Sequence, residues 1–209
     1  MPKETAMYRN TPTGYGRIAI FFHWTMALLI IGMLAFGLYL KQLPQTDPNL
    51  FQFYQLHKSF GFVVLALAAF RLIWRLANPS PKLPAEMPAL EKLAAHLGHI
   101  GLYALIFAMP ITGWFMVSAS PWGIPTVVFN VLPIPHLPYP EALGTKEQAE
   151  TFFMILHEYG AYLLIALVVV HIAAALKHHF IAKDDTLKRM TSTEPAQNAL
   201  KSHSEKAKA

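Results

Sequence analysis

Histidine is the residue type in this sequence with the widest chemical range. The 209 residues include ten histidines and no cysteine, which excludes disulfide scaffolds, Cys-ligated zinc, iron–sulfur clusters and thioether-attached haem. His157 and His171 are 14 residues apart, close to four α-helical turns. On one helix both imidazoles therefore face the same side, at levels about 21 Å apart. Imidazoles at such positions can bind iron or hydrogen-bond to neighbouring helices.

Four apolar segments must position these side chains. Hydrophobic residues make up 54% of the chain and charged residues only 14%, far fewer than a soluble domain carries. The segments cover about 17–40, 54–76, 93–118 and 152–180, and each is long enough to cross a bilayer as a helix. We therefore predict an all-α fold, a transmembrane four-helix bundle over residues 1–190. Residues 191–209 are rich in Lys, Ser and Ala, and we expect a disordered cytoplasmic tail there.

The distribution of basic residues predicts the topology. Fourteen of the 17 Lys and Arg residues lie in the N-terminal stretch, around the link between the second and third segments, or from Lys177 onward. Only Lys41, Lys58 and Lys146 lie on the opposite side. Because cytoplasmic loops carry the excess of Lys and Arg, both termini should be cytoplasmic and the loops 41–53 and 119–150 outside. The same distribution explains the net charge of +5 without nucleic acid.

Four histidines form two pairs under this topology. His57 lies near the outer end of its segment, as does His157, whereas His23 and His171 both lie near the cytoplasmic ends. Two imidazoles on different helices at one level suit bis-His ligation of haem iron, a common way for bundle cores to hold a cofactor. The alternative for any one of them is a hydrogen bond between helices. The matched levels favour two non-covalent b-type haems in the bundle core.

Charged residues near the histidines suggest further roles. Arg71 follows His57 by 14 residues, so it faces the same way at the inner level, where it can bind a haem propionate or a quinone oxygen. Lys58 can pair with an outer propionate. Glu158 has no obvious cation partner in the sequence; it can relay a proton or simply reach the interface. Seven glycines in the helices admit either a flat macrocycle or close helix packing, and we weigh these equally.

The remaining histidines are less specific. His96 and His99 share a helix face, where structural hydrogen bonding is favoured over a metal site or a proton path. His178 and His179 lie at the cytoplasmic edge beside cations, which opposes metal binding. We expect a quinone site there, with His178, Arg71 and Lys183 as cofactor-binding residues; an interfacial anchor is the alternative for the two histidines.

The outside loop 119–150 contains six prolines around the apolar stretch 127–132. Proline makes a long helix unfavourable here. Two interpretations remain equally open. The loop either lies at the membrane surface and caps the bundle, where it would cover the outer haem, or it is a plain connector.

Several ordered motifs resemble the bacterial cytochrome b561 family. They are Tyr15-Gly16-Arg17 through His23-Trp24, the stretch 56–61 (LHKSFG) with Arg71 and Arg75, the stretch 96–99 (HLGH), and the closing stretch 176–190. The resemblance covers about residues 15–190. It implies a dihaem cytochrome b of the bacterial inner membrane, with His23 and His171 on one haem and His57 and His157 on the other. One branch is similar to a superoxide oxidase, which passes electrons to ubiquinone.

The expected function is thus single-electron transfer through two b-type haems to or from a membrane quinone, with superoxide or a periplasmic redox protein as donor. The alternative is a non-catalytic haem subunit or membrane anchor that serves a separate periplasmic redox partner. A histidine-based metal transporter is a third hypothesis, and it predicts no b-type haem spectrum.

Overall fold

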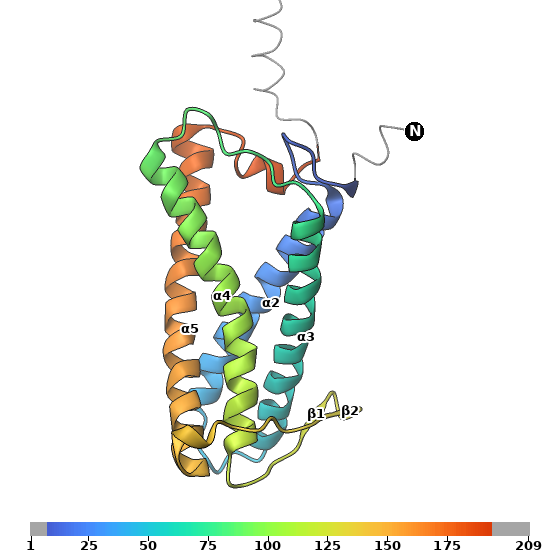
Figure 1. Ribbon diagram of the computed structural model, residues 1–209, viewed down its shortest axis with the longest axis vertical. Helices are drawn as coiled ribbons and strands as arrows, with labels where there is room; N and C mark the ends of the chain where they lie inside the picture. Colours follow the sequence, from blue (N-terminus) through green and yellow to red (C-terminus); the bar gives the residue numbers. More distant parts are fainter. Residues whose placement is uncertain (1–7, 194–209) are drawn as a thin grey trace, which may run out of the picture. The chain divides into compact units, whose positions relative to one another are not determined.

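Four long helices make up most of the chain. The computed structural model describes residues 8–193 (Figure 1). The helices are α2 (Arg17–Gln42), α3 (Leu50–Ala77), α4 (Ala89–Ala119) and α5 (Lys146–Lys177). Each is long and apolar enough to cross a membrane. The prediction of an all-α transmembrane fold with four spanning helices is confirmed.

The helices bury little of their apolar surface against one another. In the most apolar 18-residue window of each helix, only 6–11% of the residues are buried. Large side chains such as Phe21, Leu28, Phe70 and Val170 are exposed on them. In water this exposure would be strongly unfavourable. A lipid environment removes the penalty, because helices satisfy their backbone hydrogen bonds internally and can face hydrocarbon.

Some helices begin earlier than the apolar pattern indicates. Helix α5 starts at Lys146, six residues before the expected position. Gln148 Nα lies 3.4 Å from Thr145 Oγ1, and Thr145 Nα donates to Gln148 Oε1 at 2.8 Å. This reciprocal pair is a capping box, which starts a helix regardless of the hydrophobicity that follows. At the other end of α5, the π-turn η2 (His178–Ala182) continues the helix. The span long enough to cross a membrane therefore ends at Ala182.

The chain divides into two compact units. The first unit takes its residues from 1–25, 69–99 and 168–209, and the second from 26–68 and 100–167. Every one of the four helices contributes a segment to each unit. The expected tail falls mostly outside the described residues, which end at residue 193.

In the first unit, the segment after α5 returns to the helix ends. The turn η3 (Lys188–Met190) places the carbonyl of Met190 at 2.6 Å from Trp24 Nε1 on α2. Arg189 Nη1 donates to the Lys82 carbonyl at 2.6 Å, and Lys177 forms an ion pair of 2.7 Å with Glu91 on α4. These contacts fix the residues that follow α5 against α2, α4 and the α3–α4 connection.

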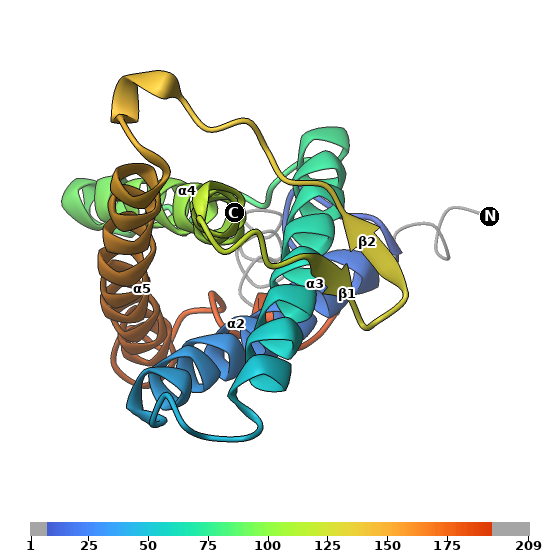
Figure 2. The ribbon, with the colours of Figure 1, turned by 90° about the horizontal axis from the view of Figure 1, so that it is seen from below.

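In the second unit, the proline-rich loop forms a short antiparallel hairpin. Strands β1 (Thr126–Val128) and β2 (Leu132–Ile134) pair with each other, and the 3₁₀ turn η1 (Glu141–Leu143) follows (Figure 2). Trp114 Nε1 on α4 donates to the Pro135 carbonyl at 2.9 Å, and Ser118 Oγ accepts from Leu137 Nα at 2.9 Å. The loop is therefore bonded to the helices along its length and is more than a connector.

Candidate functional site

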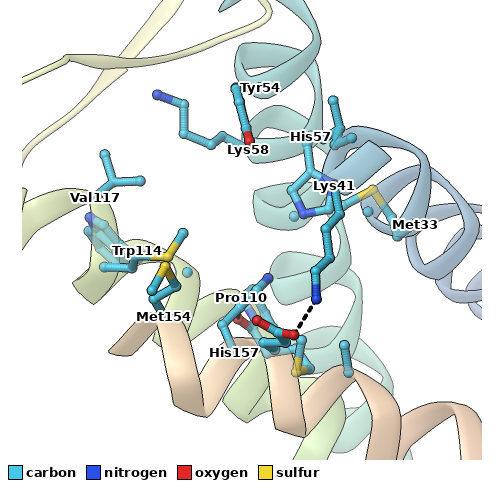
Figure 3. Close-up of a pocket in the computed structure, with 18 of the residues that line it drawn as sticks. Met33, Lys41, Tyr54, His57, Lys58, Pro110, Trp114, Val117, Met154 and His157 are labelled. Atoms are coloured by element: carbon cyan, nitrogen blue, oxygen red, sulfur yellow. Dashed lines mark hydrogen bonds and ion pairs between the residues drawn. The ribbon is translucent and has the colours of Figure 1, made fainter. Parts of the chain in front are cut away.

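A cavity in the second unit lies around His57 and His157. Its volume is about 720 Å³, in the range of sites for organic cofactors (Figure 3). The two ring centroids are 6.2 Å apart, with the ring planes at 76°. His57 comes from α3 and His157 from α5. The wall is mostly apolar and includes Leu34, Leu38, Phe62, Ile106, Leu164 and Ile165.

The histidines of the first unit repeat this spacing. The ring centroids of His23 on α2 and His171 on α5 are also 6.2 Å apart, at 56°. An imidazole bound through one ring nitrogen places its centroid about 3.1 Å from a metal, since the metal–nitrogen bond is about 2.0 Å. Two imidazoles on opposite sides of one metal are then about 6.2 Å apart. Both pairs have the spacing of axial ligands to a single metal ion.

The ring of His157 has a defined tautomer. Its Nδ1 lies 3.0 Å from the carbonyl oxygen of Met109 and 3.2 Å from Thr112 Oγ1. A carbonyl only accepts hydrogen bonds, so Nδ1 carries the proton and the lone pair is on Nε2. Such a second bond orients a ligand histidine and raises its basicity. His57 differs, because its buried Nδ1 has no hydrogen-bond partner among the described residues.

Two glycines give these rings their space. A Cβ on Gly113 would lie 3.2 Å from Cε1 of His157, and a Cβ on Gly37 would lie 3.4 Å from Cε1 of His57. In contrast, a Cβ on Gly32 or Gly61 would meet nothing within 4 Å. The sequence could not assign a role to any single glycine. The structure places Gly37 and Gly113 directly against the paired rings.

A third histidine joins the pair in the first unit. The ring of His99 on α4 lies 5.6 Å from that of His171, at 73°. Across the described residues, no group of three or more His, Cys, Asp or Glu side chains can hold a metal ion. The side chains of a pair supply only two ligands. A metal held by one pair would therefore need a cofactor that brings its remaining ligands.

The cavity of the second unit also contains an ion pair that the sequence did not reveal. Lys41 Nζ binds Glu158 Oε1, and it also donates to the Tyr162 hydroxyl at 3.2 Å (Figure 3). The expectation that Glu158 has no cation partner is wrong. Lys58, expected to bind a propionate, lines the cavity and donates to the Pro125 carbonyl of the loop at 3.2 Å.

Comparison with known proteins identifies the family. The family described as prokaryotic cytochrome b561 matches residues 14–193. The chain belongs to the prokaryotic cytochrome b561 family. It is 39% identical to cytochrome b561 homolog 2 of Escherichia coli, over 88% of this chain and 94% of that protein. It is also 30% identical to the probable superoxide oxidase CybB of Yersinia pestis, over 84% of this chain and 94% of that protein.

Membership of the cytochrome b561 family makes the chain a transmembrane electron-transfer protein of a bacterial membrane, with b-type haem as its cofactor. The second-unit pair fits that group well. It offers a lone pair on His157, an orphaned ring nitrogen on His57, an apolar cavity and two glycines against the rings. The sequence had indicated the same family, and that expectation is confirmed.

The spacing of the first-unit pair of this cytochrome also fits haem, but one hydrogen bond to His23 would have to change. Arg71 Nη2 lies 3.2 Å from Nδ1 of His23. Arginine only donates, so this contact puts the ring proton of neutral His23 on Nε2. If His23 held a haem iron through Nε2, its ring proton would be on Nδ1, and Arg71 would need a different acceptor. A haem propionate, one of the two partners expected from the sequence, would serve.

His178, which the sequence places in the expected quinone site, lies next to acidic side chains. His178 Nδ1 donates to Asp184 Oδ2 at 2.6 Å, and its Nε2 lies 3.7 Å from Glu91 Oε2. Burial would raise the pKa of Asp184, but hydrogen bonds from Thr186 and His178 outweigh it and lower the pKa. Lys183 ends the π-turn in a left-handed conformation (φ 54°). The cytochrome thus holds His178 between two carboxylates.

Proposed function

We propose that each histidine pair binds one b-type haem, His23 with His171 and His57 with His157. The observation that carries this proposal is the equal centroid distance of 6.2 Å in both pairs. When bound, haem supplies the one-electron redox chemistry. The chain supplies the axial nitrogens, an apolar surround that excludes water, and a hydrogen bond from His157 Nδ1 that orients its ring.

The proposed topology has both termini in the cytoplasm. Fourteen of the 17 basic residues support it, by the rule that Lys and Arg accumulate in cytoplasmic segments. The loop that carries β1 and β2 is then periplasmic. Electrons cross the membrane between a periplasmic donor and a membrane quinone. Cysteine labelling from the two sides of the membrane tests the orientation, because the native chain has no cysteine.

The proposed quinone site contains His178, Arg71 and Lys183. In support, His178 Nδ1 donates to Asp184 Oδ2 at 2.6 Å and its Nε2 lies 3.7 Å from Glu91 Oε2, so the ring is oriented by acidic side chains just after α5. His178→Ala should impair quinone reduction while leaving the haem spectrum intact. Unchanged quinone kinetics would exclude His178 from the site.

The donor is the least constrained part of this function. One relative is named a probable superoxide oxidase, and an anionic donor is best attracted by uncompensated positive charge. Here Lys41 is paired with Glu158, and the other outer lysines, Lys58 and Lys146, are outnumbered by Glu141, Glu147 and Glu150. We therefore propose that the electron donor is a neutral molecule or a redox protein rather than superoxide. Stopped-flow reduction of the purified cytochrome by superoxide, with and without a quinone, tests this choice. Rapid reduction that depends on superoxide would overturn it.

A further inference from the structure

The connection between α4 and η1 lacks the charge expected of a segment outside the membrane. Residues 120–140 include no Asp, Glu, Lys or Arg. Surfaces in water ordinarily carry about a quarter or more charged residues. This segment instead contains Trp122, Phe129 and several aliphatic residues. Its composition indicates an environment less polar than bulk water.

The apolar side chains of the hairpin tip point outward. Val131 is 83% exposed, Leu132 is 57% exposed and Phe129 is 46% exposed. Trp122, in the same uncharged segment, is 82% exposed. Phe129, Val131 and Leu132 are neighbours at the hairpin tip, so these three form a patch, and Trp122 precedes the hairpin by four residues. A contiguous apolar patch of this kind marks a surface that another apolar phase covers.

Three backbone N–H groups at the tip already have partners inside the protein. Phe129 Nα donates to Ser59 Oγ at 2.9 Å, Asn130 Nα to the Val127 carbonyl at 3.3 Å, and Val131 Nα to the Val128 carbonyl at 3.0 Å. Pro133, two residues after Val131, has no N–H. Three consecutive donors therefore have partners inside the protein. Lipid tolerates backbone only under this condition, whereas a loop in water has no need of it.

The tip lies beside an uncharged stretch of α3. The rings of Phe129 and Phe60 are 5.3 Å apart, edge to face. Phe60 is ten residues into α3, about 15 Å along its axis, and residues 59–70 contain no charge. In both ribbon views the hairpin lies against α3 on the side away from α5 (Figures 1 and 2). The patch is thus continuous with the lipid-facing surface of a spanning helix.

We propose that the β1–β2 hairpin is an interfacial membrane anchor. Phe129, Val131 and Leu132 insert at the boundary between headgroups and acyl chains of the bilayer that the four helices span. Trp122 lies in the headgroup region, where exposed tryptophans of membrane proteins concentrate. The occupant of the patch is lipid, because the patch adjoins an existing lipid-facing surface and carries no charge for a soluble partner to recognise.

The anchor would hold in place the base of the hairpin, which forms part of the cavity wall. The base of the hairpin contributes Ile124 and Thr126 to the cavity wall, and the Pro125 carbonyl accepts from both Gln55 and Lys58 of α3. Thr126 itself is buried. Insertion of the tip into lipid would restrain the base of the hairpin on one side. The hydrogen bonds from α3 to the Pro125 carbonyl restrain it on the other.

Site-directed spin labelling of the full chain tests the anchor. Because the chain has no cysteine, Val131→Cys gives one labelling site in an unaltered background. Ala142→Cys, an exposed position in η1 of the same loop, is the matched control. Both labelled proteins are placed in nanodiscs of phosphatidylcholine and phosphatidylglycerol. We expect oxygen to collide with the label at 131 several-fold more often than a water-soluble nickel chelate does, and the reverse at 142.

Nickel accessibility at 131 equal to that at 142 would overturn the proposal, since the tip would then face water and not lipid. Leu132→Cys provides a second reporter at the tip if Val131→Cys does not fold. Neither outcome depends on haem content or on electron transfer, so the anchor can fail while the proposed function stands, and the reverse also holds.

Discussion

The ring centroids of His57 and His157 lie 6.2 Å apart, although 100 residues separate the two in the sequence. His23 and His171 repeat the distance in the other unit. Both pairs join different helices and have the same spacing. One ligand role for both pairs therefore explains the spacing more simply than two unrelated hydrogen-bonding roles. The following predictions test this relationship and its surroundings.

Removing one ligand should remove one haem. His157→Ala leaves its pair with a single axial nitrogen, so we expect the haem content of the purified protein to fall from about two per chain to about one. The pyridine haemochrome assay measures this ratio. His136→Ala is the control, because His136 hydrogen-bonds to the Ile124 carbonyl in the loop and belongs to neither pair. Two haems retained in His157→Ala would exclude His157 as a ligand.

Adding a methyl group at Gly113 should disturb one haem and spare the other. In Gly113→Ala the new Cβ would lie 3.2 Å from His157 Cε1, so the ring must move by a few tenths of an ångström. We expect a shift in the low-spin electron paramagnetic resonance signal of one haem. Gly32→Ala is the matched control, since its Cβ meets nothing within 4 Å. Identical signals in both variants would show that Gly113 does not constrain the ring.

The sequence could predict the helices from local pattern, and it could match the histidines in pairs because the distribution of Lys and Arg gives each histidine a level in the membrane. Runs of about 20 apolar residues require a lipid environment whatever their neighbours are, and the 14-residue interval fixes the relative facing of His157 and His171 on one helix. The early start of α5 was also available from sequence, since Thr145 and Gln148 have the spacing of a capping box.

Other features could not be predicted because they depend on contacts between distant segments. Lys41 and Glu158 are 117 residues apart, and nothing local marks either as the partner of the other. The hairpin rests on Ser59, an ordinary polar residue of α3 that is 2% exposed and accepts from Phe129. Pro133 in β2 argues against a strand by propensity, yet an edge strand tolerates it.

Breaking the ion pair in the cavity should change the preference for charged donors. Glu158→Gln leaves Lys41 without a compensating carboxylate, so the local charge rises by one. We expect anionic reductants such as dithionite or superoxide to reduce the haem about two- to tenfold faster at low ionic strength, with the gain lost in high salt. Stability should change little, because both side chains of this pair are exposed and water screens their attraction.

The control for this variant is Glu147→Gln, which removes the same charge from the exposed start of α5, away from the cavity wall. A neutral hydroquinone as donor should show no gain with either variant. If Glu147→Gln accelerates anionic donors as much as Glu158→Gln does, total charge rather than the ion pair governs the rate.

Acidification should loosen the segment after α5 through Asp184. Hydrogen bonds from Thr186 and His178 lower its pKa below the ordinary value of about 3.9, although burial opposes them. A carboxyl with a lowered pKa in the folded state contributes stability that is present above its ordinary pKa and disappears as pH falls through the lower folded value. Asp184→Asn removes this contribution at every pH. The difference in melting temperature between the native protein and the variant should therefore be constant above about pH 5 and shrink below it. Asp47→Asn is the control, because the Asp47 carboxylate accepts a hydrogen bond from Asn49 Nα in the turn before α3. A difference for Asp184→Asn that does not change with pH would show that the side chain acts by shape and not by charge.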